Sequence, residues 1–175
     1  MSTPAWWLEL VDPRLRESLT RDVAEAAPCP LRGHVVLVGH RGAGKSRLLL
    51  PVAERLRRPA VELDAALGRA LFESSQLEFR RAERRAFVAV PGEAVVSAGG
   101  GFLSHHGDLL EGHTAVQVPI TFETYAERMR ADTTRPRLKP NVSLEEEIAS
   151  VFEEREVLHG RVRTVPLAAL LKRLE

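Results

Sequence analysis

The chain alternates short runs rich in β-branched and apolar residues with longer segments of mixed polarity. The runs lie at 34–38, 59–64, 93–101, 114–120 and 162–166. Their length and valine content are typical of strands buried within a parallel sheet. The pattern therefore predicts five short strands, and the first of them opens directly into a glycine-rich stretch.

The segments between these runs repeat apolar residues at helical spacing. Helices are predicted after residue 45, over 76–90, up to residue 130, over 143–158 and at the C-terminal end. Ser143 and Glu146 form a capping-box pattern at the start of the fourth. Strands separated by helices need long crossover connections, so we expect an α/β domain with a mainly parallel five-stranded sheet flanked by helices.

The residues ahead of the first strand predict one further helix. Asp12 is a candidate N-cap, Pro13 follows it, and Leu15, Leu19 and Val23 are spaced four apart. A proline-containing stretch then ends the helix. We therefore expect 1–33 to form an N-terminal helical extension and linker, and 34–175 to form the main domain.

Two tryptophans, Trp6 and Trp7, precede that helix. Aromatic side chains of this size either anchor an element on the core or contact a partner, and both interpretations remain open here.

Composition limits the partners and the compartment. The chain has 175 residues, a formal net charge of +1 and no basic tail, so neither nucleic acid nor a membrane is an expected partner. Cys29 is the single cysteine, which excludes an intrachain disulfide and a cysteine metal cluster. We expect a cytoplasmic protein that acts on small molecules, as a monomer rather than an oligomer.

The glycine-rich stretch "GHRGAGKS" fits the phosphate-binding pattern G-x-x-x-x-G-K-[ST]. Glycines let backbone N–H groups close around phosphates at the positive end of the following helix. Lys45 would add a positive charge beside the terminal phosphates, and the Ser46 hydroxyl would bind Mg²⁺. A predicted strand before the motif and a helix after it support a nucleotide site.

Proteins with this loop include mechanical ATPases, GTPase switches and kinases of small molecules. The chain has no N-K-x-D pattern to specify guanine, and its third strand ends in "SAGGG" instead of acidic residues. Elimination therefore favours a kinase with a small acceptor.

Six short motifs, in order, resemble those of the shikimate kinase family: "GHRGAGKS", "ELD", "EFRRAE", "SAGGG", "RMRADTTRP" and "EEREVLHGR". The resemblance covers about residues 34–163. It implies a phosphate-loop fold of the nucleoside-monophosphate-kinase type. It also implies an ATP- and Mg²⁺-dependent step of aromatic amino acid biosynthesis, in which a hydroxyl of shikimate or a related cyclic polyhydroxy acid is phosphorylated.

The resemblance also assigns roles to residues. Asp64 would orient the acceptor hydroxyl and help remove its proton, with Lys45 and Arg135 as the other catalytic groups. Ser46 and Glu62 would hold the metal. The nucleotide would be bound by Gly39, Gly42, Ala43, Gly44, Lys45, Ser46, Arg47, Arg128 and Arg135, and the acceptor by Asp64, Arg80, Gly99, Gly100, Gly101 and Arg155.

The chain departs from the family pattern in four places. Glu62 replaces the first aspartate of a D-x-D motif, and the stretch from 64 to 80 is shorter than expected. The segment "TTRPRLKP" adds Arg137 and Lys139, and little of the loop that covers adenine follows Arg163.

Two alternatives remain at this stage. One is a non-catalytic sensor of shikimate-kinase type that binds an aromatic acyl-CoA or a nucleotide. The other is a kinase for another acceptor such as gluconate. The adjacent His105 and His106 are expected to cap a helix or face solvent rather than bind a metal.

Overall fold

The computed structural model describes residues 4–64, 67, 75–134 and 136–175. Its described strands form one sheet in the order β2-β3-β1-β4-β5, and every neighbouring pair is parallel. This confirms the predicted sheet, although each strand is shorter than its apolar run. The strands are β1 (Val35–Val38), β2 (Ala60–Glu62), β3 (Val95–Ser97), β4 (Thr114–Gln117) and β5 (Val165–Pro166).

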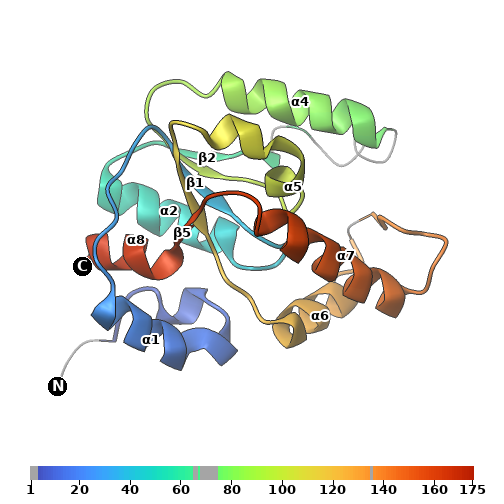
Figure 1. The fold of residues 1–175 in the computed structure, drawn as a ribbon, viewed down its shortest axis with the longest axis horizontal. Coiled ribbons are helices and arrows are strands. Elements are labelled where there is room, and N and C mark those ends of the chain that lie inside the picture. Colours follow the sequence, from blue (N-terminus) through green and yellow to red (C-terminus); the bar gives the residue numbers. More distant parts are fainter. Residues whose placement is uncertain (1–3, 65–66, 68–74, 135) are drawn as a thin grey trace.

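Helices cover both faces of this sheet (Figure 1). Val35 and Leu37 of β1 belong to a core shared with α1 (Arg16–Glu25), α2 (Lys45–Leu56) and α8 (Leu167–Arg173). The intervening Val36 and Val38 point into a second core with α4 (Gln76–Val88) and α5 (Phe102–His106). Because successive side chains of a strand point to opposite faces, the run at 34–38 is buried on both sides.

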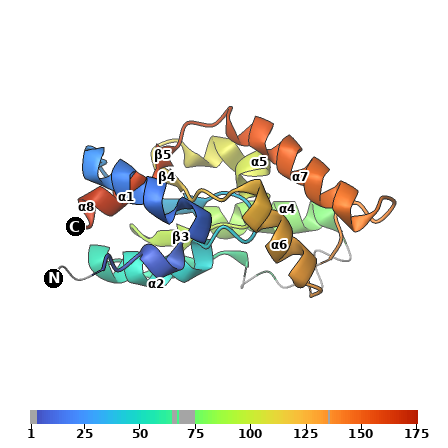
Figure 2. The same cartoon turned by 90° about the horizontal axis from the view of Figure 1, so that it is seen from below.

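The two remaining helices lie at the end of the molecule away from the chain termini, as Figures 1 and 2 both show. They are α6 (Phe122–Ala131) and α7 (Leu144–His159). The Ser143 side chain caps α7 by accepting a hydrogen bond from the Glu146 backbone N–H at 3.1 Å, which confirms the predicted N-terminus. None of the described helices is both long enough and apolar enough to cross a bilayer.

The N-terminal segment packs into the same core as the sheet. It contains two 3-10 turns, Leu8–Leu10 and Pro13–Leu15, ahead of α1. Trp7 is 4% exposed and belongs to the core cluster of β1, as does Val11. The Arg55 guanidinium lies 3.9 Å from the ring centre of Trp6. Both tryptophans therefore contact the body of the protein.

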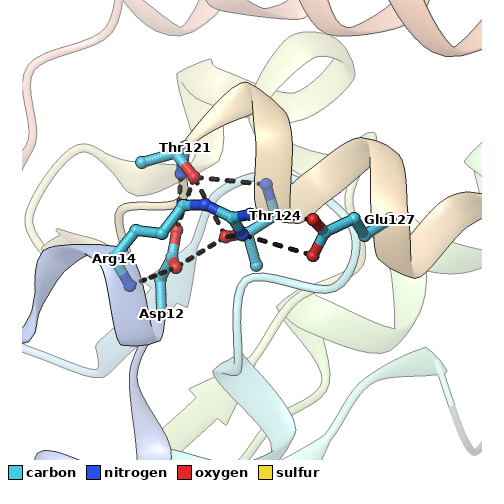
Figure 3. Close-up of polar contacts among 5 residues, drawn as sticks. All are labelled: Asp12, Arg14, Thr121, Thr124 and Glu127. Atoms are coloured by element: carbon cyan, nitrogen blue, oxygen red, sulfur yellow. Dashed lines mark hydrogen bonds and ion pairs between the residues drawn. The ribbon is translucent and has the colours of Figure 1, made fainter.

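A buried carboxylate ties this segment to α6 (Figure 3). Asp12 is fully buried and accepts hydrogen bonds from the backbone N–H of Arg14 and from the N–H and hydroxyl of Thr121, at 2.8 to 3.0 Å. The Thr124 hydroxyl donates a further bond at 2.7 Å. The Arg14 guanidinium also pairs with Glu127 at 2.8 Å. The sequence predicted Asp12 only as the cap of the helix that follows it. Its contacts with α6 were not predicted.

Candidate active site

The phosphate loop leads from the carboxyl end of β1 into α2 through backbone angles that require glycine. Gly39, Gly42 and Gly44 have φ values of 138°, 79° and 105°. A side-chain Cβ at Gly39 would also lie 2.8 Å from the backbone oxygen of Val118. These glycines let the loop turn back over the start of α2, where backbone N–H groups are available for an anion.

Charged and hydroxyl side chains border the loop. Lys45 donates a hydrogen bond from Nζ to the Gly39 carbonyl at 2.5 Å, and Arg128 of α6 donates one to the Gly42 carbonyl. The Ser46 hydroxyl donates to Glu62 Oε1 at 2.6 Å. A hydroxyl beside a carboxylate is an oxygen donor set suited to Mg²⁺. Arg47 donates instead to the Glu9 carbonyl at 2.8 Å, so its guanidinium also holds the N-terminal segment.

One cavity of about 690 Å³ runs from the loop past the carboxyl ends of β2 and β3. Ligands of parallel α/β sheets bind at this edge, and the volume lies in the range of small-molecule sites. Of the predicted site residues, the cavity wall contains Gly42, Gly44, Lys45, Ser46, Arg47, Glu62, Asp64, Arg80, Gly99, Gly100, Gly101, Arg128 and Arg155.

The part of the cavity wall beside the glycines after β3 is cationic. Arg155 of α7 is buried there, and Arg41 and Arg80 lie in the same wall. Burial, together with the charges of Arg41 and Arg80, lowers the pKa of Arg155 to about 10, against an opposing effect of Tyr125. The guanidinium is still charged at neutral pH. Several guanidinium groups in one cavity wall favour an anionic ligand, and their planar forks match a carboxylate.

A buried glutamate orients Arg80. Glu83 has no exposed surface, and its Oε1 accepts a hydrogen bond from Arg80 Nη1 at 3.0 Å and lies 3.0 Å from His106 Nε2. Burial alone would raise the pKa of Glu83, but the contacts with His106 and Arg80 hold it below its ordinary value. His106 is 5% exposed and its side chain makes no capping hydrogen bond, so the expectation of a solvent-facing or capping histidine is wrong for this residue, whereas His105 is exposed as expected.

The three glycines after β3 each adjoin one predicted acceptor residue. A Cβ on Gly99 would lie 2.5 Å from an Asp64 carboxylate oxygen, and one on Gly101 would lie 2.5 Å from Arg80 Nη2. At Gly100 the corresponding distance to Arg155 Nη1 is 3.0 Å. The absence of side chains on this stretch therefore leaves room for the aspartate and both arginines around one space.

Comparison with known proteins identifies the family to which this chain is related. The shikimate kinase family model matches residues 41–170, well over half of the chain. This chain belongs to the shikimate kinase family. Shikimate kinases of Persephonella marina and Rhodococcus erythropolis are each 30% identical to it, over 73% and 77% of this chain and 84% and 86% of theirs.

Solved structures of the family share the fold. Shikimate kinase from Acinetobacter baumannii, in complex with shikimate, matches with a TM-score of 0.67 at 23% identity, covering 81% of this chain and 89% of that one. The enzyme from Aquifex aeolicus gives a TM-score of 0.63 at 24% identity, covering 81% and 93%. Together with the strand order, these matches confirm the predicted phosphate-loop fold.

The structure does not place every predicted residue of the family site in the cavity wall. Gly39 and Ala43 shape the phosphate loop without lining the cavity, and Ala43 is fully buried. Arg135 lies outside the described residues, so its role stays a prediction.

Sequence reasoning missed several residues of the wall, notably Arg41, Phe79 and Glu83. The sequence did contain a signal that Glu83 contacts Arg80, since Glu83 follows Arg80 by three positions on a helix and side chains with this spacing are neighbours. For Arg41 the signal was weaker, because the phosphate-loop pattern leaves its position unspecified.

The two added cations after residue 135 contact α7. Arg137 Nε lies 3.1 Å from Glu147 Oε1, and Lys139 Nζ lies 2.5 Å from Glu154 Oε1. Their charges are therefore paired with acidic groups of that helix. This departure from the family pattern therefore attaches the segment to α7. Of the arginines that the structure describes, Arg128 is one that lies beside the phosphate loop.

Proposed function

We propose that this chain transfers the γ-phosphoryl group of ATP to a hydroxyl of shikimate. The observation that carries the proposal is that one continuous cavity contains both the phosphate loop and the arginines beside Asp64. Phosphoryl transfer depends mainly on positioning the two substrates and on stabilising charge, and this cavity provides a site for each substrate.

At the donor end, Lys45 and the loop N–H groups would bind the β- and γ-phosphates. Ser46 and Glu62 would hold Mg²⁺, directly or through water, and the ion would neutralise charge on the phosphate oxygens. Arg128 reaches the loop from α6 and would bind on the nucleotide side. Arg135 would close over the phosphates and exclude water.

At the acceptor end, Arg80 and Arg155 would bind the carboxylate of shikimate, with Glu83 keeping the Arg80 guanidinium in place. Asp64 would accept a hydrogen bond from the acceptor hydroxyl and help remove its proton as the oxygen attacks phosphorus. The closely spaced glycines after β3 would let the acceptor approach the backbone. A carboxylate-bearing polyol thus matches both the positive charge and the position of the base.

The N-terminal extension, residues 1–33, would brace the donor half. Its segment contacts α2 through Arg47 and α6 through Asp12. We propose that Trp7 serves as an anchor and not as a partner contact, because its ring is buried. We further propose that the chain acts as a monomer in the cytoplasm, since one chain supplies the groups assigned to both substrates and ATP is available there.

The direct test is ADP release by the purified protein with ATP. We expect turnover that requires both shikimate and Mg²⁺ and that is not supported by gluconate. Tight binding of an aromatic acyl-CoA without turnover would support the sensor alternative instead. ATP binding with no shikimate-dependent ADP would refute the proposed activity and leave the fold unaffected.

A conservative change of Arg155 tests carboxylate binding. Arg155→Lys keeps the charge but loses the two-pronged donor, so we expect KM for shikimate to rise about tenfold, equivalent to about 1.4 kcal/mol. KM for ATP should change little. Arg161→Lys, at an exposed position after α7, is the matched control. An unchanged KM for shikimate in Arg155→Lys would remove this residue from the acceptor site.

A further inference from the structure

A second group of potential ligands lies where the phosphate loop meets the C-terminal part of α7. Glu156 and His159 are three residues apart on α7, and His40 is the second residue of the loop. One ligand atom from each of these residues lies within 4.8 Å of the other two. A Glu-x-x-His pair on one helix face is a recurring arrangement at metal centres.

The two histidines are buried and incompletely bonded. His40 and His159 are each 2% exposed. His40 Nε2 lies 2.5 Å from Glu156 Oε1, but its Nδ1 and both ring nitrogens of His159 have no hydrogen-bond partner among the described residues. Buried polar groups normally have partners, so three such nitrogens in one small cluster make it a candidate ligand site.

Neighbouring side chains hold the imidazole rings in place, and solvent can reach the cluster. Phe152 stacks on the His40 ring with centroids 4.1 Å apart, and the His40 and His159 rings are 4.8 Å apart. The Glu156 side chain is 51% exposed, which gives access from solvent and room for water as a further ligand. Nearby Lys45 and Arg155 carry positive charge that opposes a cation, whereas Glu156 favours one.

We propose that His40, Glu156 and His159 form a binding site for a zinc-class divalent cation. Two imidazole nitrogens and one carboxylate oxygen are a common protein ligand set for Zn²⁺. Nitrogen donors select Zn²⁺, Co²⁺ or Ni²⁺ over Mg²⁺, which prefers oxygen ligands such as those at Ser46 and Glu62. On binding, the carboxylate of Glu156 would exchange its contact with His40 for the metal.

Such an ion would connect two parts of the kinase site. His40 belongs to the phosphate loop, and Glu156 directly follows Arg155, so the bound cation would link the loop to the helix of the acceptor arginine. By linkage, any effect of nucleotide on metal affinity must be matched by an equal effect of metal on nucleotide affinity.

The test is a titration of the chelator-treated protein with Co²⁺ in the presence of excess Mg²⁺. We expect one equivalent to bind, with visible d–d absorption, and Zn²⁺ to displace it. His159→Phe and Glu156→Gln should each weaken binding by at least about tenfold, on the scale known for losing a metal's supporting contacts. Glu153→Gln, an exposed change on the same helix, and Ser46→Ala, at the proposed Mg²⁺ site, should bind as the wild type does.

Glu156→Gln keeps the test decisive if His159→Phe fails to fold, because Glu156 is half exposed. Co²⁺ binding that is equally tight in folded Glu156→Gln and in the wild type would place the ion at other histidines and overturn the proposal. Absence of binding by the wild type would also overturn it.

Discussion

Replacing Asp64 with asparagine is expected to lower the rate of phosphoryl transfer by several orders of magnitude while ATP affinity stays nearly unchanged. The amide cannot accept the proton of the attacking hydroxyl, and general-base catalysis typically contributes about 10²–10⁴-fold to the rate. The change lies beside Gly99, in the part of the cavity wall that we assign to the acceptor. The expected result is therefore a fall in kcat of that size.

The measurement is kcat for shikimate-dependent ADP release, together with the Kd for ATP from calorimetry. Asp22→Asn, at an exposed position of α1, is the control and should behave as the wild type. Full turnover by Asp64→Asn would remove Asp64 from the catalytic role. A parallel loss of ATP affinity would show that Asp64 acts on the nucleotide side instead.

Replacing Asp12 with alanine is expected to lower the free energy of unfolding by about 3 kcal/mol. The change leaves the N–H and hydroxyl donors of Thr121 and the hydroxyl of Thr124 without their buried acceptor, and each such loss costs about 1–3 kcal/mol. For a chain of this size the expected fall in Tm is roughly 6–12 °C. Thermal and urea unfolding would measure it, with exposed Asp22→Ala as the control.

The contribution of Asp12 to the free energy of unfolding should depend on pH. Burial tends to raise the pKa of Asp12, but hydrogen bonds from Thr121, Thr124 and Arg14 outweigh it and hold the pKa below the ordinary value of 3.8. Its stabilisation is therefore complete above that value and is lost as the pH falls through the lower pKa of the folded state. The difference in stability between wild type and Asp12→Ala should narrow in that acidic range. A difference of similar size at all pH values would contradict an ionised Asp12.

The sheet and the phosphate loop could be predicted because their signals are local. The run at 34–38 and the glycines that follow it fix a strand, a turn and a helix start within a few residues. The helix α5 was missed, since its five residues are too few to show a helical period.

Site residues could be predicted where a sequence motif contains them, but not where their position depends on burial in the fold. Arg80 and Arg155 are prominent only through the family motifs, because arginines on charged helices usually face solvent. The contact between Asp12 and Thr121 spans 109 positions and has no local signature. His40 lies within the phosphate-loop motif, but nothing in the sequence places it next to His159.

The packing of the N-terminal segment affects which fragment of this protein can fold on its own. The family match begins at residue 41, whereas Trp7, Val11 and Leu19 belong to the core that also contains β1 and α8. A fragment beginning at residue 41 would lose β1, the central strand of the sheet, and the α1 surface that packs on α8, and apolar surface uncovered in this way promotes aggregation. The smallest stable unit is therefore larger than the segment recognised by evolutionary similarity.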